Sequence, residues 1–157
     1  MKRNILSAAI AGLAGGLVFG TMMQMMTAPA PDGGKMPMMQ MVASLAGSDQ
    51  VAMGWIYHLF NSAVIGALFG GILGSRVSGL CSGLAWGSVY GAAWWVLGAL
   101  VLMPLILGMP AFAPLVMAPM RPVAMGSLIG HLVYGLVTGA VFARLRQKAA
   151  YPMRTAA

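Results

Sequence analysis

Four long apolar stretches divide the chain, and short polar or proline-rich segments separate them. The stretches run over residues 5–26, 51–74, 80–107 and 123–142. Each reaches the roughly 20 residues that an α-helix needs to cross the hydrocarbon core of a bilayer. The pattern therefore predicts an all-α fold, a four-transmembrane-helix bundle that forms a single domain over residues 1–157.

The two longer connections lie on the same side of this predicted bundle. In the first, Ala28–Gly34 is rich in proline and glycine, which is typical of turn and coil. The following residues 36–46 are apolar but too short to span, and predict a short helix from about Pro37 that lies at the membrane surface. The second connection holds four prolines, and we expect it to rest on the surface too. We expect the chain to be poorly ordered after Lys148.

The second half of the chain repeats features of the first. His58 begins His-Leu and is followed eight residues later by Gly66 in Gly-Ala-x-Phe, and His131 and Gly139 stand in the same relation. The offset is 73 residues for these helices and 71 for the helices before them. Two spans return the chain to its starting side, so the halves share one orientation about a pseudo-twofold axis along the membrane normal. We predict two tandem two-helix repeats followed by a basic tail, over about 5–74, 80–144 and 145–157.

Charged residues are few and unevenly placed. The chain is 60% apolar and 7% charged, a composition that excludes an ordinary soluble domain. Seven of the nine Lys and Arg residues fall in segments that four spans leave beside the termini, whereas Lys35, Arg121 and both acids fall opposite. Because basic residues gather on the cytoplasmic side, we predict an N-in/C-in topology. This bias accounts for the net charge of +7, so we expect no nucleic-acid partner.

Glycine makes up 22 of the 157 residues and often recurs four residues apart within a span. Residues four apart share one helix face, and small residues there allow close helix packing in lipid. We predict packing through Gly12, Gly16, Gly20, Gly66, Gly70, Gly74, Gly83, Gly87, Gly91, Gly135 and Gly139. The alternative is that one of these stripes joins two copies of the chain.

The two histidines lie on the same stripes, at matching positions and therefore at equal depth. The simplest interpretation is that each donates a hydrogen bond to a neighbouring helix. A second interpretation is that both imidazoles ligate a b-type haem between facing helices. A third is Cu(I), which suits thioether and imidazole ligands. The candidate ligands for it are His58, His131, Met36, Met38, Met39 and Met41.

Methionine is abundant, and 14 of its 16 residues fall in the outer loops or the outer halves of the spans. Methionine also serves as an adaptable apolar filler or a partner-binding surface. No carboxylate lies in any span, so there is no pair for acid–base catalysis. We predict a non-enzymatic accessory or structural subunit whose Met-rich periplasmic face meets other membrane proteins or a second copy. The alternative is a small-solute transporter or channel, its path lined by the histidines with Gln24, Asn61, Ser62 and Thr138.

The fourth span carries a short motif that resembles a known family. It reads Gly130-His-Leu-Val-Tyr134, with Arg144-Leu-Arg146 at its inner end. This resembles the last helix of small YagU-like bacterial inner-membrane proteins, over about the last third of the chain. The long Met-rich first loop departs from that family. The resemblance implies a location in the bacterial inner (cytoplasmic) membrane and no particular activity.

Overall fold

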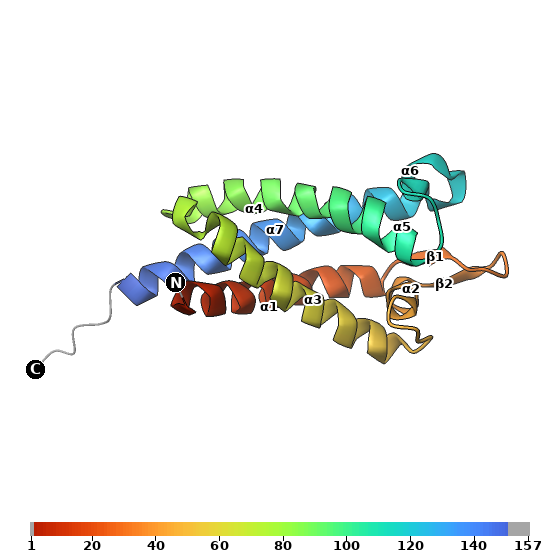
Figure 1. The fold of residues 1–157 in the computed structure, drawn as a ribbon, viewed down its shortest axis with the longest axis horizontal. Coiled ribbons are helices and arrows are strands. Elements are labelled where there is room, and N and C mark those ends of the chain that lie inside the picture. The colour runs from red at the N-terminus through yellow and green to blue at the C-terminus, as the bar shows by residue number, and fades with distance from the viewer. Residues whose placement is uncertain (1, 151–157) are drawn as a thin grey trace, which may run out of the picture.

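Four long helical segments lie side by side, and shorter elements cap one end of the bundle (Figure 1). The computed structural model describes residues 2–150, with side chains over residues 4–147. The long segments are α1 Lys2–Gln24, α3 Val51–Leu73, α4 Leu80–Trp94 and α7 Arg121–Ala150. The third continues as the π-helical η2, Trp95–Leu102, and as α5, Met103–Ile106. All four are long and apolar enough to span a membrane, which confirms the predicted bundle and indicates a multi-pass membrane protein.

The cap differs from the predicted coil and surface helix. Thr27–Pro29 (β1) and Lys35–Pro37 (β2) form an antiparallel hairpin where we expected turn and coil. Helix α2, Met38–Ser44, begins where predicted but packs on α3 with both Met39 and Ala43 fully buried. Gly54 permits this contact, because a Cβ there would lie 2.9 Å from the carbonyl carbon of Met39. The remaining short elements are η1 Gly74–Arg76, α6 Ala113–Val116 and η3 Ala118–Met120.

Short elements form the cap at one end of the bundle, and the long helices α1 and α7 begin and end at the other. The first residues of α1 and the last of α7 lie at the end opposite the cap (Figure 1). Helix α7 continues to Ala150, beyond the predicted end of the fourth span, and residues 151–157 of the predicted tail lie outside the described part of the chain.

Large apolar side chains face outward along the spans, for example Phe60 at 65% exposure and Ile72 at 59%. Such surfaces suit contact with acyl chains.

Each hairpin is held together by a close backbone crossing at glycine. Helix α1 crosses α3 where a Cβ on Gly12 would lie 2.7 Å from the Cα of Gly66. Helix α4 crosses α7 where a Cβ on Gly83 would lie 3.1 Å from the carbonyl carbon of Gly139. Such distances leave no room for any side chain, so these helices touch backbone to backbone.

Further along each hairpin the contacts again correspond. Gly16 meets Ser62 and Gly87 meets Gly135, while Gly20 meets His58 and Gly91 meets the His131 backbone. Each contact in the second hairpin is the first-hairpin contact moved by the offsets of 71 and 73 residues. This correspondence supports the duplication, which stays a prediction. Of the other predicted packing glycines, Gly70 meets Ala8, and Gly74 has only Phe142 nearby, with ordinary van der Waals spacing.

Candidate functional site

The two histidines both pack edge-on against one phenylalanine ring. The Phe19 ring centroid is 5.5 Å from that of His58 and 4.8 Å from that of His131, both with edge-on geometry. The His58 Nε2–H donates to the carbonyl oxygen of Gly16 on α1, at 2.9 Å. The His131 Nδ1–H donates to the carbonyl oxygen of Ser127, one turn earlier on its own helix, at 2.7 Å. The predicted bond to a neighbouring helix therefore exists for His58 only.

These hydrogen bonds determine which nitrogen of each neutral imidazole ring carries the proton. A carbonyl oxygen only accepts, so the nitrogen that faces it carries the proton. In neutral rings, His58 Nδ1 and His131 Nε2 then hold free lone pairs. Neither nitrogen has a hydrogen-bond partner among the described residues. Each histidine thus keeps one hydrogen-bond acceptor that no described residue uses.

Both imidazoles line one cavity of about 210 Å³, which we call the imidazole cavity. Its walls come from α3 and from η2, with Phe19 at its base and Val42 of α2 and the following Leu45 at the cap side. Asn61 also lines it, and the Asn61 amide donates to the carbonyl of Tyr57, which leaves its side-chain oxygen free. The imidazole cavity is thus an apolar space with a small number of polar acceptors.

The imidazole cavity lies between α3 and the α4–η2 segment because the two contacts between hairpins are unequal. Helices α1 and α7 touch closely at Gly15, where a Cβ would lie 2.8 Å from the Tyr134 carbonyl oxygen. The position of Gly15 in the second hairpin is occupied by Trp86, and that of Gly130 in the first by Tyr57. These positions carry bulky side chains on α3 and α4, which do not pack closely, whereas small residues let α1 and α7 meet.

Hydrogen bonds from two tyrosine hydroxyls and one indole join neighbouring helices near the imidazole cavity. The Tyr90 hydroxyl donates to the Ile65 carbonyl oxygen at 2.7 Å and so bridges α4 to α3. The Tyr134 hydroxyl donates to the Ser62 carbonyl oxygen at 2.8 Å. The Trp95 Nε1–H donates to the Ser127 hydroxyl at 3.1 Å and holds η2 on α7. A π-helical segment in a wall of this kind often marks a functional position.

A haem does not fit between the histidines as they stand. Axial ligation needs two imidazoles that face each other across a flat macrocycle. Here both imidazoles instead pack edge-on against the Phe19 ring, and each is bonded to a backbone carbonyl. The imidazole cavity, at about 210 Å³, is also below the range of roughly 300–1,000 Å³ in which larger ligands are usually held.

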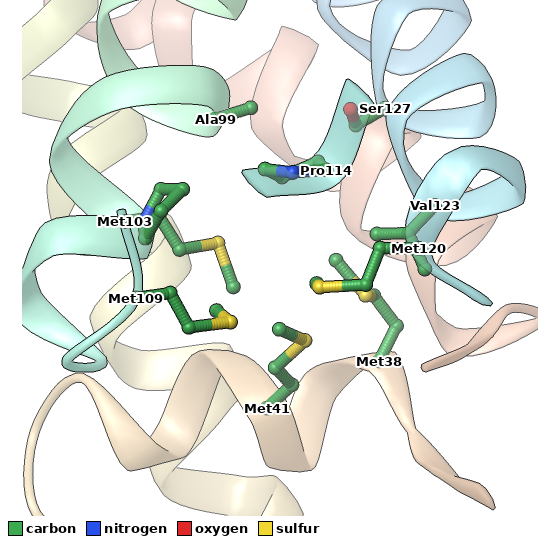
Figure 2. A pocket seen from close by; sticks show the side chains of 10 residues that line it. Met38, Met41, Ala99, Met103, Met109, Pro114, Met120, Val123 and Ser127 are labelled. Carbon is green, nitrogen blue, oxygen red and sulfur yellow. The ribbon is translucent and has the colours of Figure 1, made fainter. Parts of the chain in front are cut away.

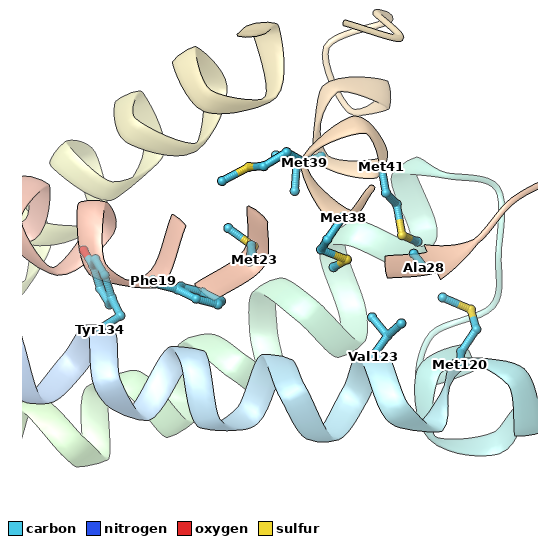
Figure 3. Packing of buried hydrophobic residues seen from close by; sticks show 10 residues of the cluster. Phe19, Met23, Ala28, Met38, Met39, Met41, Met120, Val123 and Tyr134 are labelled. Atoms are coloured by element: carbon cyan, nitrogen blue, oxygen red, sulfur yellow. The ribbon is translucent and has the colours of Figure 1, made fainter. Parts of the chain in front are cut away.

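The six residues predicted to bind Cu(I) do not form one ligand set. His58, His131 and Met38 line the imidazole cavity, and Met41 lines a smaller neighbouring hollow. Met39 points towards α1 and α3 and away from Met41 (Figure 3), and Met36 lies in β2. Within residues 2–150, no group of three or more His, Cys, Asp or Glu side chains is placed to hold a metal ion.

Sequence reasoning missed three methionines that the fold brings beside Met38 and Met41. Met103, Met109 and Met120 line the smaller hollow with them. Each of the three stands next to a proline in the sequence, at Pro104, Pro110 and Pro119. That pairing was a signal, because proline fixes the local backbone from which the methionine projects.

The structure brings together some residues of the predicted transport path and not others. Gln24 is exposed and accepts a hydrogen bond from Trp55 Nε1. The Ser62 hydroxyl donates to the carbonyl of its own helix at His58. Thr138 is fully buried where α7 meets Gly15 of α1. Asn61 lines the imidazole cavity, and Asn61 and Ser62 line a smaller pocket of about 80 Å³ with both histidines.

Comparison with known proteins gives one match. A family model described as "Family of unknown function (DUF6789)" matches residues 2–153. No curated protein and no solved structure matches the chain. An uncharacterised family agrees with our expectation, while kinship with YagU-like proteins stays a prediction. Because the match covers nearly the whole chain, the protein belongs to the DUF6789 family.

Proposed function

We propose that this protein is a non-enzymatic membrane protein that binds a small lipid-soluble hydroquinone or related phenol in the imidazole cavity. One observation carries the proposal: two histidines, each with one ring nitrogen free of hydrogen bonds to the described residues, line a single apolar cavity. Unsatisfied polar groups are costly in a membrane, where little water can replace a missing partner. A ligand with two hydroxyl groups would satisfy both.

The size and walls of the imidazole cavity support a ring-shaped ligand. An apolar cavity of about 150 Å³ holds benzene, so about 210 Å³ accommodates one six-membered ring with small substituents. Phe19, Tyr57 and Trp94 line the cavity and offer aromatic contacts. The gap lies at the level of the spans, between α3 and η2, so a ligand would enter from the acyl chains.

The hydrogen-bonding state of the histidines favours the reduced form of such a ligand. Each neutral imidazole keeps one acceptor nitrogen for a ligand, because its N–H is already used by a backbone carbonyl. A hydroquinone donates from both hydroxyls and matches two acceptors. A quinone has only acceptor oxygens. Their lone pairs would face the lone pairs of the two imidazole nitrogens, so no hydrogen bond would form.

The experiment is a titration of the purified full-length protein in lipid nanodiscs with duroquinol and, separately, with duroquinone. Binding is measured through tryptophan fluorescence, since Trp94 lines the imidazole cavity. We expect saturable binding of duroquinol and at least about tenfold weaker binding of duroquinone. Losing one buried hydrogen-bond partner costs roughly 1–3 kcal/mol, so His58→Phe and His131→Phe should each weaken duroquinol binding about tenfold.

Two further variants distinguish binding in the imidazole cavity from a general effect of substitution on the protein. Gly98→Leu should abolish binding by filling the space, because a Cβ there meets only the edge of Trp94 at 3.8 Å. Ser88→Ala is the matched control, since its hydroxyl bonds only within α4, to the Leu84 carbonyl. Duroquinol binding that survives Gly98→Leu, or that equals duroquinone binding, would overturn the proposal.

The proposal includes the bacterial inner membrane and the N-in/C-in topology. Arg76, Arg144 and Arg146 belong to the end of the bundle that holds the termini, and Lys35 and Arg121 to the cap. This distribution supports a cytoplasmic location for the termini. The cap would then lie in the periplasm.

We also propose that the protein acts as an accessory subunit that meets other membrane proteins through the cap. Met38, Met39 and Met41 are buried in the chain itself, so they are not available to a partner. Exposed methionines remain for that role, including Met25 at 85% exposure and Met117. The absence of carboxylates from the spans supports a binding role over catalysis.

A further inference from the structure

Five methionine side chains from distant parts of the chain converge on one hollow in the cap (Figure 2). Two come from α2 and one each from α5, from the loop after α5 and from η3. We call the space they surround the methionine hollow. Its thioether residues are Met38, Met41, Met103, Met109 and Met120.

The methionine hollow has the size of a single ion. Its volume is about 20 Å³, and a space of roughly 10–15 Å³ already admits one water molecule. Met38, Met41 and Met120 are buried, and Met103 and Met109 are half-buried. The hollow therefore lies inside the cap, with its sulfur lining fixed by packing on every side.

The lining selects for a soft ion of low charge. Besides the five methionines, the hollow is lined by apolar residues such as Pro104, Pro114 and Val123. The Ser127 hydroxyl also reaches the hollow, but it already donates to the Ala124 carbonyl and accepts from Trp95. Hard divalent cations need charged oxygen ligands, whereas thioethers select Cu(I). A monovalent ion also has the smaller desolvation cost in a site without a counter-charge.

From this geometry we infer that the methionine hollow is a binding site for Cu(I), held by thioethers alone. The inference is separate from the imidazole cavity, although Met38 and Met103 line both spaces. The same five methionines also belong to, or pack against, a hydrophobic core cluster. What supports a ligand beyond packing is that side chains from four segments converge on one hollow (Figure 2).

The experiment measures competition for Cu(I) between the full-length protein in detergent and bicinchoninate, with ascorbate as reductant and without oxygen. All variants carry Cys81→Ser, because the exposed thiol of Cys81 would itself bind Cu(I). The test variant is the triple change Met41→Leu, Met103→Leu and Met120→Leu. Leucine and methionine are close in volume, so the cap should stay folded.

The control variant changes the same number of methionines at exposed positions outside the hollow. It carries Met25→Leu, Met53→Leu and Met125→Leu. We expect one Cu(I) per chain in the parent and in this control. The triple hollow variant should bind at least about tenfold more weakly, since even residues that only support a ligand cost 10–100-fold when lost. His58→Phe with His131→Phe should leave Cu(I) affinity unchanged, whatever happens to duroquinol binding.

Several results would overturn the inference. One is a parent protein that takes no Cu(I) from bicinchoninate, and another is equal affinity in the two triple variants. X-ray absorption at the copper edge gives a check that does not depend on any substitution: sulfur scatterers alone are expected around copper. A nitrogen or oxygen shell would refute a thioether site. If the triple variant fails to fold by circular dichroism, Met103→Leu alone takes its place under the same criteria.

Discussion

The close crossing of α1 and α3 makes a direct prediction for Gly66→Ala. A Cβ on Gly66 would lie 2.6 Å from the Cα of Gly12 and 2.9 Å from its nitrogen. Both neighbours are backbone atoms, which cannot rotate away. Gly71, five residues later on the same helix, is the matched control, because a Cβ there meets nothing within 4 Å.

The size of the stability loss follows from how far the new methyl group pushes α1 and α3 apart. Carbon atoms in contact lie about 3.5–4.0 Å apart, so α1 and α3 must part by about 1 Å. That gap removes roughly a quarter to a half of each pair's 0.1–0.2 kcal/mol of dispersion energy. Over tens of atom pairs the loss is about 1–3 kcal/mol, as found for overpacked interiors. Both substitutions gain about 1 kcal/mol of helix propensity, which cancels in their difference.

We therefore expect Gly71→Ala to be more stable than Gly66→Ala by about 1–3 kcal/mol. The assay is reversible unfolding in mixed micelles with increasing dodecyl sulfate, followed by far-ultraviolet circular dichroism. The parent protein is measured alongside both variants. Equal unfolding midpoints for the two variants would refute a crossing that depends on glycine at residue 66.

Three further predictions test other contacts. Tyr134→Phe removes the hydroxyl that donates to the Ser62 carbonyl oxygen, and the same assay should show a loss of about 0.6 kcal/mol, the average for such bonds in membranes. Arg146→Gln removes guanidinium bonds to two carbonyls of the α3–α4 turn, and should cost about 1 kcal/mol or more. Cys81 should resist a membrane-impermeant maleimide in intact cells and react after lysis. Cys at position 32 (Asp32→Cys with Cys81→Ser) should react in intact cells, and the reverse result would invert the topology.

Much of the helical framework was predictable from the sequence, because lipid demands a continuous run of internally bonded apolar backbone. The hairpin of β1 and β2 was not, since proline and glycine signal a turn without saying whether the flanking residues pair. The burial of α2 was also unpredictable. It depends on Gly54, whose missing side chain matters only after α2 has folded back onto α3.

The candidate sites were predictable in part. The repeat placed His58 and His131 at matching positions, and both line the same cavity. The sequence did not indicate that both histidines pack against Phe19, because Phe19 is far away along the chain and one of many apolar residues in α1. The methionine hollow needs the folded second loop to bring Met109 and Met120 to α2, which no local pattern encodes.

Differences between the two hairpins matter more for function than their similarity does. The matching glycine crossings make each hairpin rigid, but they leave no space for a ligand. Space exists where the hairpins diverge: Gly15 lets α1 and α7 close, whereas the matching position on α4 carries Trp86, and α3 and α4 do not pack closely. The Arg76 guanidinium of η1 lies over the Trp86 ring, 5.5 Å from its centre. A symmetrical bundle would close both contacts, so the imidazole cavity is a consequence of unequal residues at equal positions.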